Sequence, residues 1–252
     1  MMARQEASYS LATTKSDLVQ IFKSLDNIAS EITFTLDSEG LTCRIMDPTH
    51  VSLIDIAVEN RDFIEYNIKE KESFSLDVKE FLSVLKELDN KGSIEITIRK
   101  DDIELNQNGF NFNIVKKEPG SNDCPLPKIP YHTEIQFNGI SNADLLKTFK
   151  KISSISDYIT FDSSDNSLLL SGSGNNGKTS ISFDKSKILM QNKENSISTY
   201  SLEYIIPFLK SVTKDTKVKM EYSTTKPLRI STDIGSGLYS RIHFYLAPRV
   251  EN

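Results

Sequence analysis

The residues with the clearest spacing for chemistry lie between Gly172 and Thr179, in the run SGSGNNGKTS. Gly, four residues, Gly, Lys and Thr is the order found in a P-loop, where backbone N–H groups and a lysine hold phosphates. A P-loop also needs a helix directly after the lysine, because the helix N-terminus attracts the phosphates. The segment that follows, SISFDKSKIL, alternates like a strand. We therefore expect a hairpin loop, and a nucleotide-binding enzyme is the alternative from another functional class.

The side chains that most often bind metals or act as nucleophiles are scattered along the chain. His50, His132 and His243 lack the HxxxH or HExxH spacing of a zinc site. Cys43 and Cys124 lie far apart without a CxxC pair, so neither a disulfide framework nor a zinc site is indicated. No Ser-His-Asp arrangement or pair of carboxylates can be defended from spacing. We expect no catalytic residues, no metal and no cofactor.

Composition narrows the class of protein further. The 252 residues carry a formal net charge of −5, which favours solubility and, taken over the whole chain, repels nucleic acid. No apolar run approaches the ~18 residues of a membrane helix, and the N-terminus does not resemble a signal peptide. Together with the low cysteine content, these features predict a reduced intracellular setting without membrane contact.

The two halves of the sequence resemble each other. With an offset of 127 residues, Phe22-Lys23 matches Phe149-Lys150, and the run Ile32-Thr33-Phe34 matches Ile159-Thr160-Phe161. Between the halves, residues 116–133 contain four of the eight prolines and a Gly-Ser-Asn turn, which is typical of a connector. We predict an N-terminal domain at 1–117, a connecting loop at 118–133 and a C-terminal domain at 134–252.

Each half is predicted to contain two helices and many short strands. Apolar spacing places helices at 14–29, 75–88, 141–155 and 202–213. Strands are expected at 6–13, 31–37, 41–47, 51–58, 62–68, 93–100, 101–107, 109–115, 134–137, 158–162, 167–172, 178–184, 187–190, 196–201, 217–223, 228–232 and 241–247. Pro207 should start or kink the last helix. The pattern favours an α+β fold of antiparallel sheets, each covered by helices on one face.

Lysines on the predicted helices point away from the apolar faces. Lys147 and Lys151 oppose the face built by Leu145, Phe149 and Ile152, and the other lysines lie on the exposed side or flank of their helices. Such residues are ordinarily just solvated, but on four helices they could form one basic surface that contacts phosphates without reading sequence. The candidates are Lys15, Lys23, Lys79, Lys86, Lys147, Lys150, Lys151, Lys210 and Lys214.

Two strands raise the problem of open sheet edges. Residues 109–115 and 178–184 alternate apolar and polar side chains, and open edges would recruit another chain. Head-to-tail pairing of such edges can close into a ring. The candidate subunit-interface residues are Phe110, Phe112, Ile114, Thr179, Ile181 and Phe183.

Two segments, GLTCRIMDPTHVSL at 40–53 and FYLAPRVEN at 244–252, resemble the most distinctive segments of the sliding clamps of the PCNA family. With the duplicated halves and the connector, the resemblance covers essentially the whole chain. It implies a non-enzymatic homotrimeric ring of six similar domains. Helices would line a hole for duplex DNA, and sheets would form the outer wall. The ring would serve as a processivity factor in replication and repair, in the cytoplasm of an archaeon or the nucleus of a eukaryote.

The resemblance also implies a pocket for short peptides of partner proteins, among them DNA polymerase and the clamp loader. Carried over by position, the pocket comprises Met46, His50, Val51, Leu53, Leu126, Ile129, Pro130, Pro227, Tyr245, Leu246, Ala247, Pro248 and Val250. Mostly apolar side chains with one polar group suit an aromatic-ended anchor, although core packing is the plain alternative for several of them. A checkpoint-type clamp or one subunit of a heterotrimer is the nearer alternative.

Overall fold

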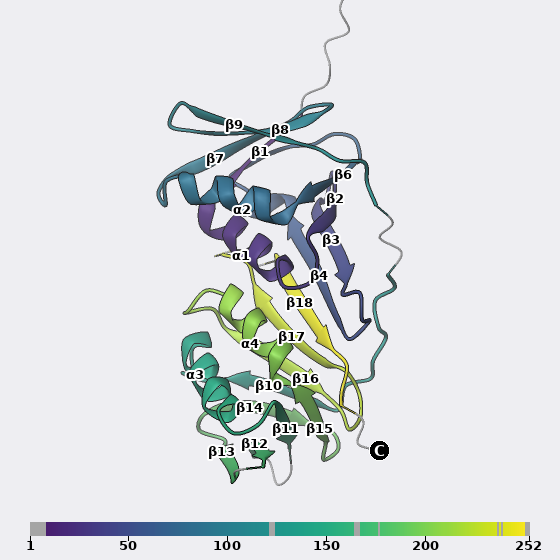
Figure 1. Cartoon of the computed structure of the whole chain (residues 1–252), viewed down its shortest axis with the longest axis vertical. Coiled ribbons are helices and arrows are strands. Elements are labelled where there is room, and N and C mark those ends of the chain that lie inside the picture. The colour runs from purple at the N-terminus through teal and green to yellow at the C-terminus, as the bar shows by residue number, and fades with distance from the viewer. Residues whose placement is uncertain are drawn as a thin grey trace, which may run out of the picture. The chain divides into compact units, whose positions relative to one another are not determined.

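The computed structural model describes residues 9–120, 124–163, 167–175, 177–235, 237 and 239–249. The chain divides into two compact units. Unit 1 comprises Met1–Ile45, Ile54–Cys124 and Ile234–Ile242, and unit 2 comprises Met46–Leu53, Pro125–Asp233 and His243–Asn252. Each unit therefore contains a short segment from the other half of the sequence. Figure 1 shows the elements in chain order.

Unit 1 contains two sheets and two α-helices. One sheet has the strand order β5-β1-β7-β8-β9, and the other includes β4-β3-β2-β6, in which the last residue of β3 and the first two of β4 belong to unit 2. The elements are β1 (Tyr9–Thr14), α1 (Lys15–Leu25), β2 (Glu31–Asp37), β3 (Gly40–Met46), β4 (Ser52–Glu59), the 3₁₀ turn Asn60–Asp62, β5 (Glu65–Asn67), β6 (Glu72–Asp77), α2 (Val78–Glu87), β7 (Ser93–Ile98), β8 (Asp102–Gln107) and β9 (Phe110–Val115).

Unit 2 repeats this arrangement. Its sheets have the orders β14-β10-β16-β17-β18 and β13-β12-β11-β15. The elements are β10 (Thr133–Phe137), α3 (Asn142–Ser153), β11 (Tyr158–Asp162), β12 (Leu168–Gly174), β13 (Gly177–Phe183), β14 (Ile188–Asn192), β15 (Ile197–Ser201), α4 (Leu202–Ser211), β16 (Val218–Tyr222), β17 (Leu228–Asp233) and β18 (Arg241–Leu246), of which the first two residues belong to unit 1.

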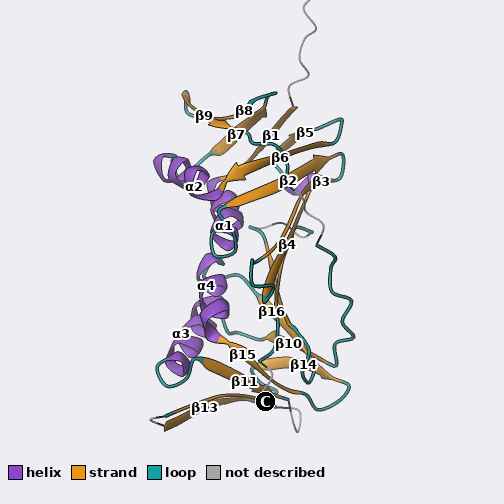
Figure 2. Cartoon of the chain, turned by 45° about the vertical axis from the view of Figure 1, so that its right-hand side comes forward, coloured by secondary structure: helices purple, strands orange, loops and turns teal. Residues whose placement is uncertain are grey.

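The duplication is complete at the level of topology. Adding nine to each strand number of unit 1 gives the strand order of unit 2 in both sheets, and α1 and α2 correspond to α3 and α4. All strand pairings whose register is known are antiparallel, and within each unit the helices lie on one side of the strands (Figure 2). The predicted α+β fold with two tandem similar domains is confirmed.

Matching residues of the two halves make matching core contacts. Phe22 of α1 packs on Phe34 of β2 with ring centroids 5.3 Å apart, and their counterparts Phe149 and Phe161 lie 6.2 Å apart. All four side chains are buried. Phe22 also stacks on Phe81 of α2 at 3.8 Å, which joins the two helices of unit 1. The repeat in the sequence therefore preserves an aromatic contact between helix and sheet.

α1, α2 and α3 begin where a side chain can satisfy one of their first free N–H groups. Thr14, Asp77 and Ser141 accept hydrogen bonds from the backbone three residues further on, as N-caps do. The prediction that the second helix begins near Ser75 is wrong. Ser75 is paired with Thr33 in β6, a strand missing from the prediction, and the helix starts after the Asp77 cap.

The fourth helix also departs from expectation. Pro207 was expected to start or kink this helix; it lies inside α4, well after the first residue Leu202, so it does not start the helix. The apolar face formed by Ile205, Phe208 and Leu209 is buried, and tertiary packing supports the helix despite the proline. Because α4 ends at Ser211, Lys214 lies in the following turn rather than on the helix.

Candidate binding surfaces

The Gly172–Thr179 segment is a hairpin and not a phosphate loop. Gly172 pairs with Thr179 and Gly174 with Gly177 across β12 and β13, and strand β13 continues to Phe183. Since a strand rather than a helix follows Lys178, the helix N-terminus that a P-loop requires is missing from this described segment. The hairpin prediction is confirmed, and the nucleotide-binding alternative loses its structural basis.

The glycines of this segment are explained by packing. A Cβ added at Gly172 would lie 2.6 Å from Cγ2 of Ile152 and 2.9 Å from Cβ of Ser156. A Cβ at Gly174 would overlap the carbonyl oxygen of Ile155. Glycine therefore allows β12 to pass close to the end of α3.

The candidate lysines are exposed on the helices, with two exceptions. Lys23, Lys79 and Lys86 are exposed on the helices of unit 1, and Lys147, Lys150, Lys151 and Lys210 on those of unit 2. Lys15 is half-buried, and its Nζ donates a hydrogen bond to the carbonyl oxygen of Leu88 at the end of α2. Lys15 therefore links two helix ends, and Lys214 is exposed in the turn after α4.

Strands β9 and β13 both lie at the edges of their sheets. On β9, Phe110 is 71% exposed and Phe112 is half-buried. On β13, Ile181 is exposed and Thr179 half-buried. The side chains of these four residues are therefore wholly or partly exposed at the two sheet edges.

Two of the candidate interface side chains are buried in the core of their own unit. Ile114 is 1% exposed, and Phe183 makes an edge-to-face contact with Phe137 of β10 at 5.7 Å between ring centroids. The interface prediction for these two residues therefore concerns their backbone, because strands pair at a sheet edge through backbone groups. Alternation identifies one face of each strand, but that face runs from solvent at one end to the core at the other.

Much of the predicted peptide pocket belongs to unit 2, including the segment before β4. His50 is exposed, and Met46, Val51, Ile129, Pro227, Ala247 and Pro248 are half-buried. Leu126 and Pro130 of the connector are exposed. Leu53, Tyr245 and Leu246 are buried, so these three candidates pack in the core of unit 2. Val250 lies outside the described residues.

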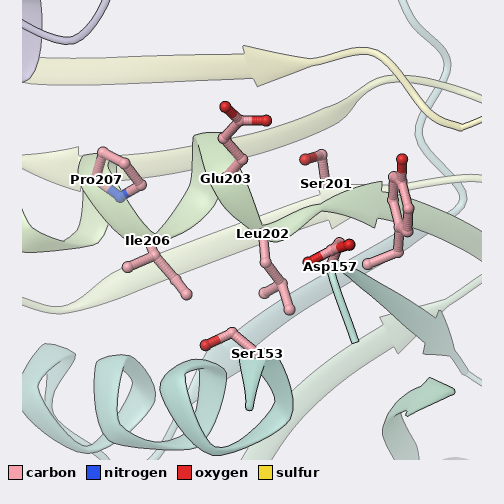
Figure 3. A pocket seen from close by; sticks show the side chains of 8 residues that line it. Ser153, Asp157, Ser201, Leu202, Glu203, Ile206 and Pro207 are labelled. Atoms are coloured by element: carbon pink, nitrogen blue, oxygen red, sulfur yellow. The ribbon is translucent and has the colours of Figure 1, made fainter. Parts of the chain in front are cut away.

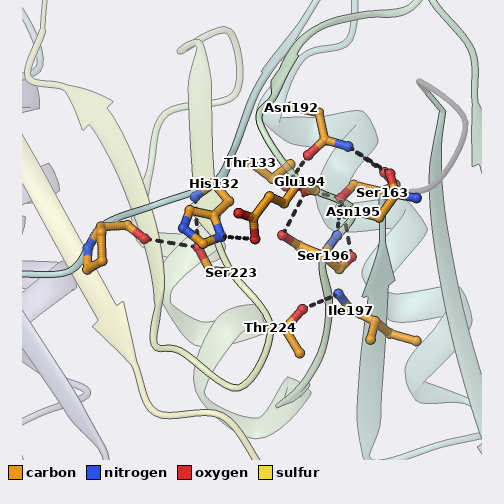
Figure 4. Close-up of polar contacts among 11 residues, drawn as sticks. His132, Thr133, Ser163, Asn192, Glu194, Asn195, Ser196, Ile197, Ser223 and Thr224 are labelled. Atoms are coloured by element: carbon orange, nitrogen blue, oxygen red, sulfur yellow. Dashed lines mark hydrogen bonds and ion pairs between the residues drawn. The ribbon is translucent and has the colours of Figure 1, made fainter.

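The connector is attached to unit 2 just after the pocket candidates. Ser223 Oγ donates to the carbonyl oxygen of Pro130 and accepts from the backbone N–H of His132, at 3.2 and 2.7 Å. His132 Nδ1 lies 3.2 Å from a carboxylate oxygen of Glu194 (Figure 4). These contacts hold the C-terminal end of the connector in place. Leu126 and Ile129 lie just before this attached end.

Three further residues lie beside the same candidate surface and were missed by sequence reasoning. Arg229 makes a two-pronged ion pair with the buried Glu221, at 2.6 and 2.5 Å, and its guanidinium lies 5.0 Å from the ring centroid of Tyr131. Burial raises the pKa of Tyr131. Tyr131 directly follows Pro130, so its place in the connector was the available signal. Arg229 and Glu221 lie on neighbouring strands, and nothing in the sequence spacing pairs them.

A groove between the end of α3 and the start of α4 was also not predicted. Figure 3 shows Ile206 and Leu202 beside Ser153, with Asp157 and Glu203 at the rim. Because Asp157 and Glu203 are both exposed acids, the groove does not extend the basic surface of the helices. Across the described residues, no cluster of three or more His, Cys, Asp or Glu side chains could hold a metal ion, and no helix is long and apolar enough to cross a membrane.

Family comparison identifies the fold over nearly the full length of the chain. Residues 6–122 match the N-terminal domain of proliferating cell nuclear antigen (PCNA), and residues 126–249 match its C-terminal domain. The chain belongs to the PCNA family. The two matches lie on either side of the short segment 123–125 within the connector.

Relatives of this PCNA-family chain are named as replication proteins. The DNA polymerase sliding clamp of Nitrosopumilus maritimus is 38% identical over 242 residues, which cover 94% of this chain and 96% of that protein. The DNA polymerase sliding clamp of Cenarchaeum symbiosum is 34% identical over 252 residues, covering 97% and 100%.

Solved PCNA structures have the same fold. A. fulgidus PCNA bound to the C-terminal region of FEN-1 superimposes with a TM-score of 0.89 at 18% identity, covering 97% of this chain and 99% of that one. PCNA from Thermococcus kodakaraensis gives 0.87 at 20% identity, covering 96% and 100%.

Proposed function

We propose that this chain is a DNA polymerase sliding clamp, a ring that encircles duplex DNA and tethers replication and repair proteins without catalysing a reaction. Tethering acts through effective concentration, because a polymerase that leaves the primer end stays close enough to rebind. The sequence similarity to proteins named DNA polymerase sliding clamp, over 94% of the chain, supports this function. An intracellular setting in an archaeon or a eukaryotic nucleus follows from the same proposal.

Ring closure is supported by one observation in particular, the unequal burial of strands that correspond by duplication. β9 corresponds to β18, yet β9 buries only Ile114, whereas β18 buries Ile242, Phe244, Tyr245 and Leu246. β13 corresponds to β4, and most of β13 is exposed whereas most of β4 is buried. A second copy whose β13 meets β9 would cover both open edges, and this head-to-tail pairing closes into a homotrimer.

The exposed lysines of the helices would face the DNA. A clamp must move along any sequence, and lysine contacts to phosphates position a protein on DNA without reading its bases. Lys23, Lys79, Lys86, Lys147, Lys150, Lys151 and Lys210 are the exposed helix candidates, with Lys214 beside them and Lys15 less accessible. The net charge of −5 is compatible with this, because encirclement rather than affinity would retain the ring.

The surface of unit 2 around Met46, Val51, Ile129, Pro227 and Ala247 would bind the peptide motifs of partner proteins. Half-buried apolar side chains, with His50 as the polar group, suit a short peptide that buries an aromatic anchor. We keep 1–117, 118–133 and 134–252 as the proposed domains and connector along the sequence.

The assembly is tested first, by light scattering across a range of concentrations. We expect a mass of three subunits. A persistent monomer contradicts the homotrimer and leaves a subunit that needs different partners. That alternative is favoured by the likeness in fold to one chain of the PCNA2-PCNA3 complex of Sulfolobus tokodaii, at a TM-score of 0.83.

The function itself is tested by topological retention on DNA. The chain, loaded with a clamp loader onto a nicked circular duplex, should co-elute with the circle and be released when the circle is cut into a linear molecule. Equal retention on both forms would mean ordinary binding, and absence from the circle would contradict the clamp function.

A further inference from the structure

The loop before β4 is folded around a single carboxylate. Asp47 is 6% exposed. Its two carboxylate oxygens accept hydrogen bonds from three different residues that follow it in the loop. Oδ2 accepts from the N–H of Thr49 at 3.1 Å and from its hydroxyl, whereas Oδ1 accepts from the N–H groups of Val51 and Ser52 at 2.8 and 2.5 Å. The backbone of Asp47 closes the loop with bonds to Ser52 and His50, both at 2.9 Å.

This pattern requires a carboxylate and not merely a side chain of that shape. Each oxygen receives donors, and an ionised Asp is an acceptor at both. Asn would place an amide N–H₂ against backbone N–H groups in either orientation, because one oxygen cannot serve both sides. A buried donor facing a donor loses a hydrogen bond and leaves a polar group unsatisfied.

The loop holds two of the proposed pocket residues in place. His50 has a φ of 60°, a left-handed conformation that costs energy for a residue with a side chain and persists where its surroundings enforce it. The carbonyl oxygen of Val51 accepts a hydrogen bond from the N–H of Ala247 at 2.8 Å. The loop therefore determines the position of His50 and also contacts the C-terminal segment that contributes Ala247 and Pro248.

We propose that Asp47 is a positioning residue for the peptide pocket, which it organises by holding the loop Asp47–Ser52 in the shape that presents His50 and Val51 and orders Ala247. This inference rests on the proposed function of that pocket. Asp47 itself need not touch the peptide, and its effect passes through the loop.

The test is the affinity of Asp47→Asn for a fluorescein-labelled peptide from the C-terminal region of A. fulgidus FEN-1, measured by anisotropy at a temperature where every protein is folded. We expect binding about tenfold weaker than that of the wild type, the scale of one lost hydrogen bond to a charged group. The matched control is Asp37→Asn, which removes the same charge from a turn in which Oδ1 accepts from the N–H of Glu39 at 2.9 Å. An amide can keep that bond, so the control should bind like the wild type.

The dependence on pH separates this role from a general loss of stability. Burial would raise the pKa of Asp47, but the hydrogen bonds from Thr49, Ser52 and Val51 outweigh burial and hold this pKa below its usual range. The affinity gap between wild type and Asp47→Asn should stay constant down to about pH 4, the ordinary pKa of an Asp side chain, and narrow only as the pH falls through the lower pKa of Asp47. His50 is the other titratable side chain of the loop, and it is present in both proteins.

The possible outcomes are distinct. Equal affinity of Asp47→Asn and wild type overturns the inference, as does an equal loss in the Asp37→Asn control. A wild type that does not bind the peptide overturns the proposed pocket, and the positioning role with it. If Asp47→Asn does not fold, Thr49→Val removes one donor from the carboxylate and should weaken binding about threefold. An unchanged affinity of a folded Thr49→Val then overturns the inference.

Discussion

The two units share a topology, and they differ in the loop that joins two corresponding strands. The turn between β12 and β13 in unit 2 is a tight hairpin at Gly174 and Gly177. Its counterpart between β3 and β4 is the longer loop organised by Asp47. Duplication thus kept the sheets and helices, while a connecting loop acquired buried hydrogen bonds and a candidate binding surface.

The largest loss of stability should come from replacing a core side chain that occurs in both units. Phe149 is completely buried and corresponds to Phe22. Phe149→Ala should lower the free energy of unfolding by about 3–5 kcal/mol, because it leaves a cavity between α3 and β11. Phe22→Ala should cost a similar amount, measured for both by urea denaturation. Leu189→Ala, on an exposed side chain outside the proposed interface, is the control and should cost less than about 0.5 kcal/mol. A large decrease in the free energy of unfolding for only one of the two variants would mean that the two matching contacts do not contribute equally to stability.

The next prediction tests the difference in burial between the exposed edge strand β9 and its buried counterpart β18. Phe110→Asp should raise the dissociation constant of the proposed trimer about a hundredfold, because it puts a charge where an apolar side chain is covered. Light scattering would show monomers where the wild type is still assembled. Leu189→Asp on β14 is the control, since Leu189 is equally prominent at 64% exposed and lies outside the predicted interface. A Phe110→Asp protein that remains trimeric would remove β9 from the interface.

The repeat itself was visible in the sequence because the core contacts are made by residues of the same type at a constant offset. Phe22 and Phe34 match Phe149 and Phe161, and those pairs are where helix meets sheet. Many strands were also predictable, because alternation of apolar and polar side chains shows which segments are strands. The start of α2 was placed too early, at Ser75, because apolar spacing alone does not mark the first residue of a helix, whereas the helix is set by the Asp77 cap.

The candidate surfaces are harder to predict from sequence, for a physical reason. Apolar type does not distinguish a side chain that lines a surface from one that packs in the core, and Leu53, Tyr245 and Leu246 of the predicted pocket are buried. Ile114 and Phe183 of the predicted interface are buried as well. Asp47 was not singled out in the sequence, because its four hydrogen-bond donors are brought together only by the folded loop.

The lysines of α3 allow a test of how strongly unit 2 contacts DNA. Replacing Lys147, Lys150 and Lys151 with Ala should reduce the slope of log affinity against log salt by about 2.7, since each phosphate contact contributes about 0.9. Affinity for a short duplex, measured by anisotropy at several salt concentrations, gives this slope. The control replaces the exposed lysines Lys185, Lys187 and Lys193, which lie off the helices and change the net charge equally. Equal changes in both proteins would mean that net charge, and not the helix surface, attracts DNA.

The smallest effect concerns an ion pair in the sheet of unit 2. Glu134 lies 2.8 Å from Lys219, and the hydrogen bond from Lys219 holds the pKa of Glu134 below its usual range. A carboxylate whose pKa is lower in the folded state adds stability above its unfolded pKa, near 4.3, and loses this contribution as pH falls through the folded value. Glu134→Gln should therefore cost about 0.5 kcal/mol at pH 7 and almost nothing near pH 3. The control, Glu95→Gln, replaces an exposed carboxylate on β7 of unit 1. Denaturation at both pH values checks this, and a cost for Glu134→Gln that stays the same at low pH would show that shape rather than charge is responsible.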